Sequence, residues 1–139
     1  VVSGLAAGVD TAALTAALEA NGRVVAVIGT GITRFYPAEN RQLQNDIAQH
    51  GLLISQFLPR ATPSKTSFPM RNAVMSAYAK ASLVVQADDR SGARLQARIA
   101  AKQGRAVYLY EPIMKHESWA QTMVTKGEAT FVTSVQDIG

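Results

Sequence analysis

Few side chains in this sequence are of a type that could break or form bonds. Asp88 and Asp89 are adjacent, as a carboxylate pair for acid–base work or a magnesium site would be. Acids just before a helix are more often a cap and a solvated charge, which is the interpretation we favour here. His50 falls in the last turn of a predicted helix, where a cation suits the dipole, and His116 has no evident partner. We expect no catalytic residue, no metal and no cofactor.

Glycines and cations, by contrast, recur at predicted turns in a pattern suited to binding anions. Backbone N–H groups of glycine turns and of helix N-termini can face a phosphate. The residues concerned are Gly4 and Gly8, Gly29 and Gly31, Arg71 and Asn72, and Ser91 and Gly92. Binding without chemistry is therefore the function that these residues favour.

Two further features support an anionic, base-containing ligand. Arg94, Arg98 and Lys102 fall at i, i+4 and i+8, which places them in one cationic stripe along a helix. Phe68, just before Arg71, could stack on a base, although a hydrophobic staple at the start of a helix explains it equally well.

The elements that must position these residues alternate regularly along the chain. Apolar runs predict strands over 1–4, 23–29, 52–57, 82–87, 105–110 and 129–134. Helical patterns lie over 10–22, 38–51, 68–81, 91–104 and 118–127. Asp10 is placed to cap the first helix, and Leu43, Ile47 and Ala48 should face inward from the second. Short connections between alternating elements predict an α/β fold with a mostly parallel sheet, as a single domain over 1–139.

Two nucleotide-binding motifs are excluded. The turn GTGITR at 29–34 lacks the third glycine of a dinucleotide-binding fingerprint, and it does not open directly into a helix. No Walker-type glycine-rich loop is present.

Charge and composition narrow the class of partner. The chain has 139 residues, a net charge of +4 and no cysteine, which excludes thiolate catalysis and disulfides and makes a reducing cytoplasm the expected compartment. Ten cations against three acids between Arg60 and Lys115 give that stretch +7. This asymmetry favours a polyanionic partner over a membrane, the alternative being a solvated basic face. The opening VVSG has no methionine, so we expect a piece of a longer protein.

Five segments in order resemble one known family. SGLAAGVDTAALTAAL, VVAVIGTGITRFYPAENRQL, GLLISQF, FPMRN and SGARLQARIAAKQGR are similar to the DNA-processing protein A (DprA/Smf) family, over Val1 to about Tyr108 and more weakly at the C-terminus. The resemblance implies a Rossmann-like three-layer domain that binds single-stranded DNA, forms a homodimer and delivers strands to a RecA-type recombinase during natural transformation. It implies no established enzymatic activity.

The resemblance also completes the set of candidate residues. It adds Ser3 to the first turn and makes Lys65 part of a basic pocket with Arg71 and the helix that starts at Ser91, while Phe68 would stack on a base. The candidate nucleic-acid and phosphate-binding residues are Ser3, Gly4, Gly8, Gly29, Gly31, Lys65, Phe68, Arg71, Asn72, Ser91, Gly92 and Arg94.

Departures from the family keep two alternatives open. Residues that differ from the family's usual ones are Ala7, Leu14, Met70, Ala73 and the pair Glu111-Pro112, and the family's first strand would precede Val1. The family usually has arginine where Ala7, Met70 and Ala73 stand. The loss of these arginines would suit a sensor domain that binds a nucleotide. The enzyme alternative is a LOG-type nucleotide phosphoribohydrolase, whose triple-glycine signature is absent from the corresponding stretch DDRSGARLQ.

Overall fold

The computed structural model describes residues Val1–Gly139, which form two compact units. The first covers Val1–Met75 and the second Ser76–Gly139. The single domain over 1–139 stays a prediction.

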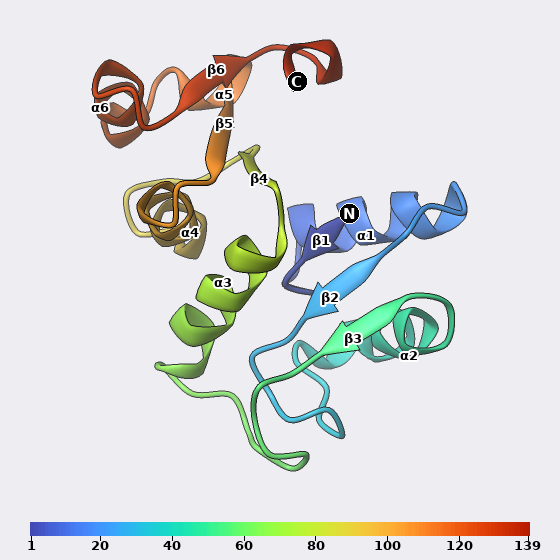
Figure 1. Ribbon diagram of the computed structural model, residues 1–139. Helices are drawn as coiled ribbons and strands as arrows, with labels where there is room; N and C mark the ends of the chain where they lie inside the picture. Colours follow the sequence, from blue (N-terminus) through green and yellow to red (C-terminus); the bar gives the residue numbers. More distant parts are fainter. The chain divides into compact units, whose positions relative to one another are not determined.

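The first unit is a small parallel sheet with helices packed on it. Strands β1 (Val2–Ser3), β2 (Val25–Val27) and β3 (Leu52–Ile54) lie side by side in that order, with Val25 paired to both Val2 and Leu52 (Figure 1). Helix α1 (Val9–Glu19) packs on β1, and α2 (Arg41–His50), preceded by the short helix η1 (Ala38–Asn40), packs on β2 and β3. The core residues are Leu5, Leu14, Val24, Ala26, Ile28 and Ile47.

The second helix of this unit buries a different face from the predicted one. Ile47 is buried and Leu43 partly so, as predicted, but Ala48 is exposed and Gln44 is buried in its place. The Gln44 side chain donates a hydrogen bond from Nε2 to the carbonyl oxygen of Arg34 at 2.9 Å. Because this acceptor belongs to a loop, hydropathy alone cannot identify the buried glutamine.

The second unit repeats the strand–helix alternation. Strands β4 (Ala81–Val84), β5 (Ala106–Tyr110) and β6 (Thr130–Val132) form a second parallel sheet in that order. Helix α4 (Gly92–Lys102) packs on β4 and β5. The short α5 (Glu111–Met114), α6 (Ser118–Thr125) and η2 (Val135–Asp137) complete it. The core includes Val84, Ala97, Leu109, Met114, Trp119 and Met123.

The predicted fold class is confirmed. All strand pairs are parallel and helices flank both sheets, so the chain is an α/β protein of Rossmann-like type. Each predicted strand and helix is present, with α3 at Ser67–Tyr78. The unpredicted α5 starts at Glu111, and Pro112 follows in its first turn, where a missing N–H does no harm. None of the helices combines the length and apolar character that crossing a bilayer requires.

Candidate functional site

The first turn, which follows β1, is closed by a carboxylate of the chain itself. Asp10 Oδ2 accepts hydrogen bonds from the backbone N–H groups of Gly4 at 3.1 Å and Ala6 at 3.2 Å. The prediction that Asp10 caps helix α1 is therefore wrong, because the N-cap residue is Gly8 and Asp10 binds the preceding turn instead. Gly8 has a φ of 89°, a conformation that favours glycine. Ser3 is buried in β1.

The second turn, which follows β2, is held by a neighbouring loop. The backbone N–H of Gly31 donates to the carbonyl oxygen of Ala61 at 2.8 Å, and that of Thr33 donates to Pro59 at 3.0 Å. A side chain at position 31 would collide with the carbonyl oxygens of Leu58 and Pro59. Gly31 is thus required by the close approach of the loop. Its N–H is occupied, which corrects the prediction that this amide faces an anion.

Gly29 makes room for an aromatic ring instead. A Cβ atom at this position would lie 2.7 Å from Cδ1 of Phe68, the second residue of helix α3. The Phe68 ring lies 5.6 Å from that of Tyr36, centroid to centroid, with an angle of 42° between the planes. Tyr36 is 53% exposed and Phe68 is half-buried, so we call this pair the aromatic rim of the first unit. Tyr36 was not among the predicted binding residues, although it matches the family's pattern by position.

Arg71 lies next to Phe68 and is buried. Its Nη1 donates to the carbonyl oxygen of Gly4 and to that of Val27 at 3.3 Å, and its Nε donates to Asn72 Oδ1 at 2.9 Å. The guanidinium also lies 5.4 Å from the centre of the Phe68 ring. Burial lowers the pKa of Arg71, and the nearby charge of Asp10 opposes that shift. Arg71 therefore positions the first turn, β2 and Phe68, and its role as a phosphate ligand stays a prediction.

Lys65 lies on a turn that the chain fixes just before α3. The Ser64 N–H donates to Ser67 Oγ at 2.9 Å, and the Ser67 N–H donates to Ser64 Oγ at 3.1 Å. Lys65 itself is exposed between them, three residues before Phe68. The first unit thus brings together Gly4, Gly29, Phe68, Arg71 and Asn72.

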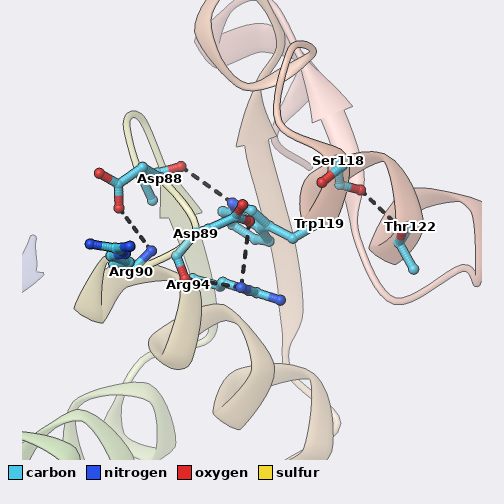
Figure 2. Close-up of polar contacts among 8 residues, drawn as sticks. Asp88, Asp89, Arg90, Arg94, Ser118, Trp119 and Thr122 are labelled. Atoms are coloured by element: carbon cyan, nitrogen blue, oxygen red, sulfur yellow. Dashed lines mark hydrogen bonds and ion pairs between the residues drawn. The ribbon is translucent and has the colours of Figure 1, made fainter.

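In the second unit, the turn before α4 contains a capped helix start and an ion pair. Ser91 is the N-cap residue, and its side chain accepts from the Ala93 N–H at 3.1 Å, while Gly92 is the first helical residue. Arg94 Nη1 contacts Asp89 Oδ1 at 3.5 Å, and Asp88 Oδ1 accepts from the Arg90 N–H at 2.9 Å (Figure 2). Asp88 is thus a turn acceptor and Asp89 an ion-pair partner, whereas the interpretation favoured from the sequence was a cap and a solvated charge; the residue that caps α4 is Ser91. The predicted basic pocket of Lys65, Arg71 and the helix that starts at Ser91 concerns two different units and stays a prediction.

Comparison with known proteins gives matches to one family, and these matches extend over the whole chain. The family model of the DNA recombination-mediator protein A matches residues 1–139. The chain is 38% identical to the DNA processing protein DprA of Streptococcus pneumoniae over 139 residues, which cover 99% of this chain and 49% of that protein. It is 41% identical to the Bacillus subtilis DNA processing protein DprA over 108 residues, or 78% of this chain and 36% of that one.

Solved structures give the same result. The X-ray structure of DNA processing protein A from S. pneumoniae matches with a TM-score of 0.88 and 37% identity, over 99% of this chain and 49% of that one. A structure that describes the single-stranded DNA binding mode of DNA processing protein A from Helicobacter pylori matches with a TM-score of 0.86 and 29% identity. This match covers 98% of this chain and 62% of that one. The chain spans between about a quarter and a half of the curated relatives it matches. It belongs to the DNA recombination-mediator protein A family.

Proposed function

We propose that this chain binds single-stranded DNA without chemically changing it, as part of a protein of the DNA-processing type that acts in DNA uptake and natural transformation. The family match over residues 1–139 supports this proposal. So does the similarity to the H. pylori protein, whose single-stranded DNA binding mode has been described. Within the chain, the observation that carries the proposal is the aromatic rim of Tyr36 and Phe68 beside the glycine turn at Gly29.

The rim suits unpaired bases because it offers ring surface with little shape selectivity. Every base has a flat π-face, so stacking on an aromatic side chain tolerates any sequence and is worth about 1–3 kcal/mol per base. Tyr36 presents the more exposed ring, and Phe68 lies close to Gly29 and to the Arg71 guanidinium. A duplex would keep its bases stacked inside, so the rim favours single strands.

Phosphate contacts are proposed in each unit by itself. Lys65 is exposed close to the rim in sequence and can pair with a phosphate without losing any contact of its own turn. In the second unit, the N-terminus of α4 at Ser91 and Gly92 offers backbone N–H groups and the positive end of a helix dipole. The absence of chemistry is proposed because Asp88 and Asp89, the adjacent acids, are engaged with Arg90 and Arg94.

The test is a binding titration of the 139-residue chain with a short fluorescent oligothymidylate. Tyr36→Ala and Phe68→Ala should each weaken binding by about 1–3 kcal/mol, or roughly 5- to 150-fold in Kd. Tyr78→Ala is the matched control, because Tyr78 is a tyrosine of similar exposure, 55% against 53%, at the other end of α3. It should leave the affinity unchanged.

Three results would contradict the proposal. Equal affinity of all three variants and the wild type would remove the rim from the site. Stabilisation against heat by mononucleotides but not by the oligonucleotide would favour a nucleotide sensor. Hydrolysis of nucleoside monophosphates would favour a phosphoribohydrolase.

We further propose that the chain forms a homodimer and passes its bound strand to a RecA-type recombinase, as the resemblance implies. Sedimentation equilibrium tests the dimer, since a monomer at micromolar concentration would contradict it. Faster recombinase assembly on oligothymidylate in the presence of the chain tests the transfer, and slower assembly would contradict it.

A further inference from the structure

The second unit contains a cationic groove that the proposed site does not use. It lies between α4 and α6 and has a volume of about 590 Å³. We call it the α4–α6 groove. The cations that line it are Arg94, Arg98, Lys102 and Lys126, and Glu128 is the acid among its lining residues.

The cations follow a line along the groove. Arg94, Arg98 and Lys102 recur every fourth residue of α4, so they are about 6 Å apart along the helix axis at a rise of about 1.5 Å per residue. Lys126 is the C-cap residue of α6 and adds a fourth cation from that helix. Arg98, Lys102 and Lys126 are exposed and form no ion pair within the chain. A row of free cations matches a polymer that carries one negative charge per repeat.

Arg94 is the one cation of the row that is already paired, and only weakly. Its Nη1 donates to the backbone oxygen of Asp89 at 2.9 Å and contacts the carboxylate at 3.5 Å, where the Asp89 side chain is 64% exposed (Figure 2). Its Nε is buried and has no hydrogen-bond partner. Buried donors are normally paired, so an unpaired one beside a groove marks a place where an acceptor is missing. The Asp89 carboxylate contacts the Arg94 guanidinium in the way that an anionic ligand would.

The groove offers no surface for stacking a base. Trp119 lines it but is only 5% exposed, its indole N–H donates to the Ala87 carbonyl oxygen at 3.3 Å, and the Arg94 guanidinium lies 6.0 Å from the ring centre (Figure 2). Ser118 and Thr122 are exposed residues along the α6 side, and the Thr122 hydroxyl donates to the Ser118 carbonyl oxygen at 3.0 Å. A groove that is lined by charged and hydroxyl groups and has no accessible aromatic ring is suited to phosphates and sugars and not to stacked bases.

We infer that the α4–α6 groove binds the phosphodiester backbone of a single nucleic-acid strand as a second contact, separate from the aromatic rim. This inference rests on the proposed function and extends it: the rim holds bases, and the groove holds the charge of further nucleotides of the same strand. A phosphate that reaches Arg94 takes the place of the Asp89 carboxylate.

The experiment compares two double variants of equal charge in the 139-residue chain. Arg98→Gln with Lys126→Gln removes two exposed groove cations, and Lys80→Gln with Lys115→Gln removes two exposed cations of the same unit outside the groove. For a long oligothymidylate, the groove variant should reduce the slope of log Kd against log salt by about 0.7 for each lost contact, and the control should not. Asp89→Asn, which removes the competing carboxylate, should tighten binding.

Trp119 provides a second readout because it is the only tryptophan of the chain. Its fluorescence should change when wild type binds the oligonucleotide, and the groove variant should lose that change. Equal salt slopes for both double variants, with an unchanged Trp119 signal, would contradict strand binding in the α4–α6 groove. If Phe68→Ala then still weakens binding, the proposed function at the aromatic rim remains valid without the groove. A Trp119 response to tripolyphosphate or to mononucleotides but not to oligothymidylate would overturn a strand as the ligand.

Discussion

Arg71 connects three segments of the first unit through a single buried guanidinium. The carbonyl oxygens of Gly4 and Val27 accept from Nη1, so the turn after β1 and the end of β2 are tied to helix α3. Hydrogen bonds from a charged donor contribute about 1.5–3 kcal/mol each, and removing the donor leaves both buried acceptors without this partner. Arg71 is therefore needed for the shape of the proposed site even where it does not touch DNA.

We predict that Arg71→Met lowers the free energy of unfolding by about 2–4 kcal/mol, a range that allows for partial relaxation around the lost bonds. Urea denaturation followed by circular dichroism measures it. Arg23→Met is the control, because Arg23 is exposed and only its backbone oxygen is used. Affinity for oligothymidylate should also fall more for Arg71→Ala than for Arg23→Ala. Equal effects of the two positions on stability and affinity would contradict this account.

At the level of single elements, the C-terminal 3-10 helix η2 is held by a carboxylate. Asp137 Oδ2 accepts from the backbone N–H groups of Thr133 at 2.9 Å and Ser134 at 3.1 Å, and from the Thr133 hydroxyl at 3.1 Å. The Ser134 side chain completes a capping box with the N–H of Asp137. These hydrogen bonds favour the ionised form and lower the pKa of Asp137.

A pH-dependent stability difference follows from this shift. A carboxylate with a lowered pKa in the folded state stabilises that state above its unfolded pKa, and the contribution is lost as the pH falls through the folded value. We predict that Asp137→Asn is less stable than wild type at neutral pH and that the two melting temperatures converge in acid below about pH 3–4. Differential scanning calorimetry between pH 2 and pH 7 measures this. A constant difference over that range would show that the charge of Asp137 has no part in it.

The sequence was sufficient to predict the order and type of the regular elements. Strands such as 23–29 are β-branched runs, and Gly51 ends α2 as predicted, so local patterns determine these features. The short helix α5 was missed because four residues carry too little periodicity. Gln44 was missed as a buried residue because its acceptor at Arg34 lies outside the helix.

The details of the site depended on contacts that no local pattern encodes. Gly31 was assigned to anion binding, whereas the loop carbonyl oxygens of Leu58 and Pro59, nearly thirty residues away in sequence, explain why it is glycine. The sequence alone predicts Arg71 to be an exposed cation at the start of a helix. Its hydrogen-bond partners are instead the carbonyl oxygens of Gly4, in the turn after β1, and of Val27, in β2. Spacing thus identified these segments as candidates, while the role of each side chain required their packing.

For the whole molecule, the distribution of charge matters more than the net value of +4. The stretch from Arg60 to Lys115 carries +7, so the remaining residues carry −3. Some of these cations are used internally, since Arg71 is buried and Arg105 donates from Nη2 to the Ala77 carbonyl oxygen. Others, including Lys65, Arg98 and Lys102, are exposed and available to a polyanion.

The resulting prediction concerns the dependence of binding on salt. If the chain neutralises about three to five phosphates of a single strand, each contact releases counterions and contributes about 0.7 to the slope of log Kd against log salt. Kd should therefore rise by about two to three and a half orders of magnitude for a tenfold rise in salt. Fluorescence anisotropy with oligothymidylate measures it. A methylphosphonate oligothymidylate, which keeps the bases but has no backbone charge, should bind far more weakly at low salt and show almost no slope. If both strands bind equally well, stacking alone accounts for the affinity, and the basic stretch is then a solvated face that does not take part in recognition.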